Sequence, residues 1–293
     1  MTPRDVAAAA QLACLLEATA PKPGNVSPGR NFTDLRYDDF VVAAAAIGEP
    51  FASATFRPLG TTIRLAVEAT QRRARTNVNL GIVLLLAPLV RAAGSASDLR
   101  EASRLVLDTT TIEDARQVYA AIRLAAPGGL GTAEAQDVAD EPDMTLLEVM
   151  RLAADRDGIA REYSTGFEAT FEIGAPAVER ARGEGLDWDD AVVEAYLTLL
   201  AAAPDTHIAR RGGADLAVEV SSRARTVLAA GGVRSVAGRQ AINLMDAALR
   251  DPRHTANPGT TADLTAAAIF VALVRLKADP TLKADPTLKA APG

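Results

Sequence analysis

Cysteine and histidine are nearly absent from this chain of 293 residues, which contains one cysteine, Cys14, and two histidines, His207 and His254. A single cysteine cannot build a disulfide framework or a thiolate metal site. Two histidines leave few ligands for zinc, so an all-oxygen magnesium site is the more credible metal option. The cysteine content also fits a reducing compartment, and we expect a cytoplasmic protein.

Positive charge is also in short supply, with 31 Lys and Arg against 37 Asp and Glu and a formal net charge of −6. This balance argues against a nucleic-acid or anionic-membrane surface. The first apolar run, residues 6–16, is interrupted by Gln11 and too short to cross a bilayer. We therefore expect no nucleic-acid and no membrane partner, and the sequence leaves a homo-oligomer open.

Alanine is abundant, apolar residues recur at spacings of three and four, and β-branched clusters are short, so the periodicity predicts an all-α fold. We expect one helical catalytic domain over residues 1–276, with a site formed by the loops between helices. The repeated units of residues 277–288 carry a proline each, which predicts a disordered tail over 277–293. Helices are expected over residues 4–19, 37–47, 58–75, 80–93, 98–107, 113–125, 146–154, 158–182, 187–202, 214–230, 232–249 and 261–276.

The loop of residues 21–30 interrupts this helical pattern with three prolines and two glycines. Its glycines allow backbone N–H groups to approach a ligand, and Lys22 and Arg30 supply the kind of positive charge that binds phosphate. The alternative is an ordinary connector between helices with a solvated lysine. Asp34 and an Asp-Asp pair follow, and the pair also suits a plain helix N-terminus.

Further polar segments separate the later helices. Residues 75–81 hold Asn77 beside a helix start, and residues 127–134 form a glycine-rich turn that ends at Glu134. The turn lacks the third glycine and the preceding strand of a dinucleotide loop, and no Gly-Lys-Ser/Thr follows it. Residues 155–163 alternate carboxylates and guanidiniums around Asp157, which suits either a magnesium triphosphate or a solvated helix junction.

The two strongest segments lie near the end of the chain. The first runs from Asp205 through Arg210 and Arg211 to a Gly-Gly pair, and the second is Asn-Pro-Gly-Thr-Thr-Ala-Asp at residues 257–263. Helix capping explains part of each. A helix that opens at Thr260 with Asp263 in its first turn could equally receive an anion.

Taken together and in order, the motifs resemble those of the triphosphoribosyl-dephospho-CoA synthases over roughly residues 17–270. They are Pro-Lys-Pro-Gly at 21–24, the turn at Asn77, the glycine-rich turn to Glu134, Asp-Thr-x-x-x-Arg-x-Gly-Gly at 205–213, and Pro-Gly-x-x-Ala-Asp at 258–263. The resemblance implies an all-helical transferase that moves the triphosphoribosyl group of ATP to the ribose 2′-hydroxyl of dephospho-CoA, or a similar nucleotide acceptor, and releases adenine. ATP would be the substrate, with Mg²⁺ expected as cofactor.

Within that resemblance each candidate residue receives a role. The general base would be Asp205 or Asp263, with Glu134 as a further catalytic carboxylate. The metal ligands would be Asp34, Glu134 and Asp157. Substrate and phosphate would be held by Lys22, Asn25, Arg30, Asn77, Arg210, Arg211 and Thr260.

Two other functions remain open at this stage. One is a magnesium-dependent glycohydrolase of ADP-ribose-like compounds, which would use water as acceptor. The other is a non-catalytic helical protein that binds a nucleotide. Whether the separate motifs meet at one site decides whether a single-site enzyme is reasonable.

Overall fold

The computed structural model describes residues 1–95, 98–128, 131–251 and 253–278. In these ranges the chain consists of helices and their connections, with no β-strand, which confirms the predicted all-α fold. Two residues of the glycine-rich turn, 129–130, and residues 279–293 of the predicted tail lie outside the described residues.

The helices are α1 (Pro3–Thr19), α2 (Tyr37–Ala46), α3 (Gly48–Ala52), α4 (Leu59–Gln71), α5 (Leu80–Ala92), α6 (Leu99–Asp108), α7 (Ile112–Ala125), α8 (Leu146–Ala153), α9 (Gly158–Thr165), α10 (Ala175–Gly183), α11 (Trp188–Ala202), α12 (Thr206–Gly212), α13 (Ala214–Ala229), α14 (Val236–Leu249) and α15 (Gly259–Ala278). Short 3-10 turns occur at η1 (Ala54–Phe56) and η3 (Gly232–Arg234), and η2 (Ala169–Gly174) is π-helical.

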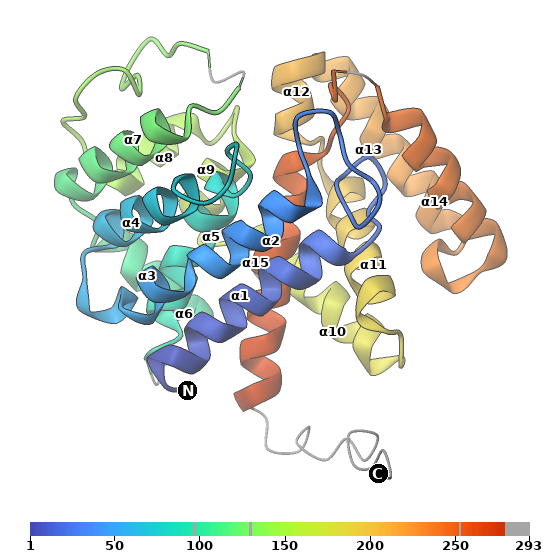
Figure 1. The fold of residues 1–293 in the computed structure, drawn as a ribbon, viewed down its shortest axis with the longest axis horizontal. Helices are drawn as coiled ribbons and strands as arrows, with labels where there is room; N and C mark the ends of the chain where they lie inside the picture. Colours follow the sequence, from blue (N-terminus) through green and yellow to red (C-terminus); the bar gives the residue numbers. More distant parts are fainter. Residues whose placement is uncertain (96–97, 129–130, 252, 279–293) are drawn as a thin grey trace.

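Helix α15 runs through the middle of the molecule and packs against α1, α5, α10 and α11 (Figure 1). Its residues 266–272 are fully buried, and most are alanine, which lets neighbouring helices approach closely. By length and composition Gly259–Lys277 could cross a membrane, but 67% of its most apolar window is buried inside the protein. That burial is what the core helix of a globular fold requires.

Most helix boundaries follow local signals. For example, α7 and α8 begin at capping boxes in which Thr111 and Thr145 exchange hydrogen bonds with acidic residues three positions later. The expected single helix over residues 158–182 is wrong, because the chain leaves helical geometry at Gly166 and Phe167, both at positive φ. Helix α3 was not expected from the sequence.

Candidate functional site

The first turns of α5, α9, α12 and α15 meet at one end of α15, and we call them the helix-start cluster. Hydrogen bonds join three of them directly. The Gly158 N–H donates to Thr206 Oγ1 at 3.0 Å, and Thr206 Oγ1 lies 3.1 Å from Thr260 Oγ1. Helix dipoles make such starts electropositive, so their convergence favours an anionic ligand or a carboxylate.

Asp205 connects two helices of the cluster, α12 and α15. Its Oδ1 accepts the Ile208 N–H at 3.0 Å and caps α12. Its Oδ2 accepts both the N–H and the hydroxyl of Thr261, each at 2.7 Å. With three hydrogen bonds and 2% exposure, this carboxylate holds α12 against α15. The geometry therefore suits a positioning role better than that of a base.

Asp263 differs from Asp205 in having no hydrogen bond from any described residue, while it keeps some exposed surface. Burial, followed by the negative charges of Glu17, Asp205 and Asp157, raises the pKa of Asp263 well above its ordinary value. One oxygen lies against α5, where a Cβ built on Gly81 would come within 2.0 Å of Asp263 Oδ2. A crowded but accessible carboxyl with a raised pKa is suited to proton transfer.

Lys22 is fully buried, and its Nζ lies 3.1 Å from Glu17 Oε1 and donates to the Glu17 and Ala20 carbonyls. Glu17 is 1% exposed, and burial raises its pKa despite the opposing charge of Lys22. The ammonium group of Lys22, which was predicted to contact phosphate, is therefore already engaged in an ion pair inside the protein. The negative charge of Glu17 also contributes to the raised pKa of Asp263.

Other predicted phosphate and substrate residues are divided between two areas. Thr260 belongs to the helix-start cluster, and Arg210 joins it by donating to Asp157 Oδ2 at 2.6 Å. Asn77 Oδ1 accepts the Leu80 N–H at 3.2 Å and so tightens the start of α5.

The second area joins the loop of residues 21–30 to the end of α14. Arg30 Nη1 donates to Asp246 Oδ2 at 3.1 Å, and Asn25 Nδ2 donates to Asn257 Oδ1 at 2.9 Å. Arg211 Nη2 donates to the carbonyl of Arg253 at 2.7 Å. The loop therefore lies against the segment that leads into α15, as Figure 1 shows near α13.

The three predicted metal ligands do not come together. Asp34 pairs with His254 Nε2, Asp157 caps α9 and pairs with Arg210, and Glu134 is an exposed residue of the connection between α7 and α8. Across the described ranges no three His, Cys, Asp or Glu side chains share a metal-binding arrangement. The sequence placed these carboxylates together because each follows a polar turn, and the fold separates the turns.

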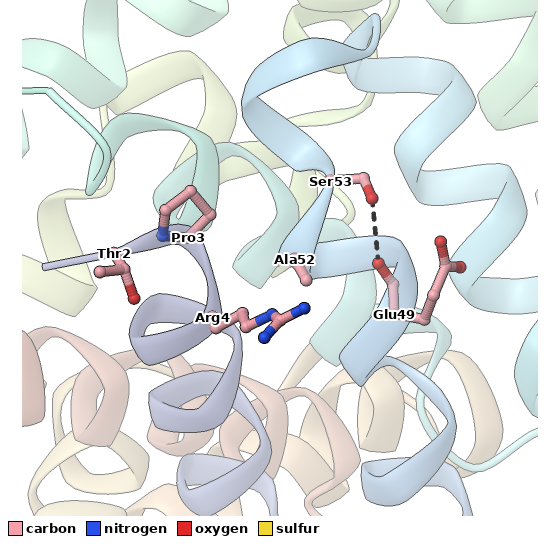
Figure 2. Close-up of a pocket in the computed structure, with 6 residues that line it drawn as sticks. All are labelled: Thr2, Pro3, Arg4, Glu49, Ala52 and Ser53. Carbon is pink, nitrogen blue, oxygen red and sulfur yellow. Dashed lines mark hydrogen bonds between the residues drawn. The ribbon is translucent and has the colours of Figure 1, made fainter.

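Two surface hollows are lined by residues outside the helix-start cluster. One, with a volume of about 710 Å³, is lined by Thr2, Pro3, Arg4, Glu49, Ala52 and Ser53 (Figure 2), and the Ser53 hydroxyl donates to the Glu49 carbonyl at 3.5 Å. A second is lined by Ala46, Glu49, Pro50, Ala69, Arg72 and Arg73. Neither contains a predicted site residue, so we attach the chemistry to the helix-start cluster.

Sequence reasoning missed several residues of this cluster. Gly81 and Gly158 leave room for Asp263 and Thr260, since a Cβ on Gly158 would lie 2.8 Å from Thr260 Cγ2. Glu17 is a lone carboxylate on the buried side of an apolar helix, which was an available signal. The sequence assigns no role to His207, although it lies within the motif that begins at Asp205.

Fold and site together define an all-helical protein whose converging helix starts, flanking arginine and isolated carboxyl suit an anionic nucleotide. The model of the ATP:dephospho-CoA triphosphoribosyl transferase family matches residues 3–281, and the chain belongs to this family.

Relatives and one solved structure agree with that membership. A crystal structure from Archaeoglobus fulgidus, assigned as a triphosphoribosyl-dephospho-CoA synthase, is 29% identical with a TM-score of 0.61 and covers 79% of this chain and 97% of its own. Proteins assigned as 2-(5''-triphosphoribosyl)-3'-dephosphocoenzyme-A synthases include one from Pseudomonas syringae pv. tomato, 33% identical over 114 residues, and one from Pseudomonas putida, 36% identical over 115 residues. These matches span 39% of this chain and 38% and 40% of the two relatives.

Proposed function

We propose that this protein transfers the 5-triphosphoribosyl group of ATP to the ribose 2′-hydroxyl of 3′-dephospho-CoA, or of a closely related nucleotide, and releases adenine. Membership of the family supports the reaction type. The observation that carries the proposal is Asp263, an unpartnered carboxyl with a raised pKa set among converging helix starts.

The reaction breaks the bond between ribose C1′ and adenine and forms a bond from C1′ to the acceptor oxygen. Its transition state resembles an oxocarbenium ion. The departing adenine takes up one proton and the acceptor hydroxyl releases one to solvent, so protons balance over the reaction. Because Asp263 retains its proton to a higher pH than an ordinary aspartate, we assign it to protonate the leaving adenine. This changes its sequence-based role from base to acid.

Phosphate binding follows from the same arrangement. The dipoles of the converging helices favour negative charge, and Arg210 adds a guanidinium that is already held at the site by Asp157. We propose that Arg210 and Thr260 contact the triphosphate and that Lys22 acts indirectly, by holding Glu17 near Asp263. Arg30 and Arg211 would keep the neighbouring loops in place.

Magnesium is expected to enter with ATP, since a triphosphate supplies most of the oxygen ligands that Mg²⁺ requires. Of the three carboxylates suggested by the sequence, Asp157 is the one that lies in the helix-start cluster. We propose it as the protein's contact to the ion, which would neutralise phosphate charge there.

Adenine release measured by chromatography tests the proposal. The purified chain is incubated with ATP and Mg²⁺, with and without 3′-dephospho-CoA. We expect adenine and a triphosphoribosylated acceptor to form together and only when the acceptor is present. Release of adenine without acceptor would support a glycohydrolase instead. Absence of turnover, with a rise in melting temperature on adding MgATP, would support a nucleotide-binding protein without catalysis.

A further inference from the structure

The imidazole of His207 is a polar group of the helix-start cluster that the proposed reaction does not yet use. It follows the cap Asp205 in the first turn of α12, and its ring covers Gly259, the first residue of α15. A Cβ built on Gly259 would lie 3.2 Å from Cγ and 3.3 Å from Nδ1 of His207. Gly259 and Asp263 are four residues apart and share one face of α15.

Two features make His207 available to a ligand. No hydrogen bond to either ring nitrogen comes from the described residues, and the side chain keeps part of its surface exposed. Its backbone is fixed, because the adjacent Thr206 and Asp205 bond to Thr260 and Thr261 across the two helices. The ring thus has a defined position and unused hydrogen-bonding groups.

The surroundings of His207 favour the neutral form of its imidazole. Burial lowers the pKa of His207; Asp205 and Asp157 oppose the effect, whereas Arg210 and Arg211 add to it. A neutral imidazole carries one donor and one acceptor. Phosphate offers acceptors only and prefers a charged partner, whereas a ribose hydroxyl both donates and accepts.

We propose that the imidazole of His207 binds a ribose hydroxyl of the nucleotide substrate, while the guanidinium of Arg210 serves the phosphates. This deepens the proposed function and rests on it. The hydrogen bond orients the sugar beside Asp263, whose carboxyl lies one helical turn away along α15. Protonation of the ring at acid pH removes the acceptor, so binding weakens as the pH falls.

Nucleotide affinity as a function of pH tests this role. MgATP binding is measured by calorimetry from pH 5.5 to 8 for the wild type, His207→Asn and His207→Leu. Asn keeps a donor and an acceptor but does not titrate, so we expect nearly unchanged affinity at pH 8 and a smaller acid loss than in the wild type. Leu provides neither group, and we expect affinity about 3- to 10-fold weaker at pH 8.

The Asn variant is also the reference for other titrating groups. The terminal phosphate of ATP and Asp263 both change charge with pH, and both are present in every variant. Only the part of the pH dependence that His207→Asn removes belongs to the imidazole. The inference would be refuted if wild type and His207→Asn lost the same MgATP affinity at acid pH. It would also be refuted if His207→Leu bound MgATP as tightly as the wild type.

Deoxynucleotides identify the contacted hydroxyl. If His207 binds the 2′- or 3′-hydroxyl of ATP, the corresponding 2′-deoxy- or 3′-deoxy-ATP binds the wild type more weakly than ATP but binds His207→Leu as well as ATP does. Equal binding of ATP and both analogues to the wild type excludes the contact. No binding of ATP by the wild type would refute the proposed function, whereas normal ATP turnover with no response to His207 substitutions would refute this inference alone.

Proton titration by NMR gives a readout independent of activity. The chain has two histidines, so the imidazole signal missing from His207→Asn is that of His207. We expect this signal to titrate below the ordinary range near pH ~6.5 and to move lower still when MgATP binds, because the ligand selects the neutral ring. A shift to higher pH on ATP binding would indicate a phosphate contact and contradict the proposal.

Discussion

At the scale of single residues, the site depends on two aspartates that have the same side chain and opposite surroundings. Asp205 accepts three hydrogen bonds, whereas Asp263 accepts none from the described residues and has a raised pKa. Local sequence cannot separate them, because each lies near a helix start with a threonine within two residues. What distinguishes them is which side chains the fold brings near each carboxyl.

Asp263→Asn tests the assignment of the acid. The amide cannot deliver a proton to adenine, so we expect adenine release to fall about 10²- to 10⁴-fold while MgATP still binds. The same variant should be more stable at pH 8. In the wild type the native state holds its Asp263 proton to a higher pH than the unfolded chain, so ionisation destabilises the native state as the pH rises through its raised pKa.

The measurement is a series of melting temperatures for the wild type and Asp263→Asn from pH 4 to pH 8. We expect the advantage of the variant to grow with pH and to vanish near pH 4, where both side chains are neutral. A variant that is uniformly less stable would show that Asp263 makes a stabilising contact, contrary to its lack of hydrogen bonds.

At the scale of elements, function arises where helix starts meet rather than along any one helix. The first turn of helix α5 contacts Asp263 at Gly81. Glycine is the only residue type without a Cβ, and a Cβ at this position would lie too close to the Asp263 carboxylate. Glycine in a helix is otherwise unfavourable by about 1 kcal/mol relative to alanine. The close approach of the carboxylate therefore explains why a glycine occupies position 81, which helix propensity alone would disfavour.

Gly81→Ala should separate stability from activity. The new Cβ would require Asp263 to move, since the two atoms would be 2.0 Å apart, and we expect adenine release to fall about 10²-fold. Gly183→Ala is the matched control, because Gly183 is also helical and nothing lies within 4 Å of its Cβ position. Equal activity of the two variants, measured beside their melting temperatures, would remove Asp263 from the reaction centre.

Most helices could be predicted from periodicity and caps, because those signals are local. The break after α9 could not, since one glycine is tolerated in many helices. It is stabilised by Glu162, whose buried carboxylate accepts the N–H groups of Ala169 at 2.9 Å and Thr170 at 2.8 Å. These two hydrogen bonds form in the folded chain, and the sequence pattern does not reveal them. The three carboxylates proposed as metal ligands do not group together among the described residues for a related reason, because residue type predicts a ligand but not which loops approach each other.

At the scale of the whole molecule, the site exists only because distant parts of the chain are held together. Asp246 on α14 accepts the Gly24 N–H at 2.8 Å, Arg30 at 3.1 Å and Arg250 Nε at 2.9 Å. Arg250 in turn donates to the carbonyl of Asn25 at 2.7 Å. These bonds join the loop of residues 21–30 to the segment entering α15, across more than two hundred residues of sequence.

Asp246→Ala should therefore destabilise the whole protein. The change leaves two arginines and a buried backbone N–H without their acceptor, and we expect a loss of about 2–4 kcal/mol in the free energy of unfolding. Urea unfolding measures it, with an unchanged dependence on urea showing that the native state keeps its compactness.

Asp190→Ala is the control, since Asp190 also makes a bidentate pair, with Arg239 at 2.9 and 2.5 Å, but on the surface between α11 and α14. Exposed pairs contribute about 0–1 kcal/mol, so the control should unfold close to the wild-type midpoint and retain adenine release. Because Asp246 anchors the loop that contains Lys22, and Lys22 holds Glu17, its loss should also slow adenine release in the fraction that stays folded. If Asp246→Ala were no less stable than Asp190→Ala, the loop would be held by its other contacts, and its fixed position beside α15 would not depend on charge.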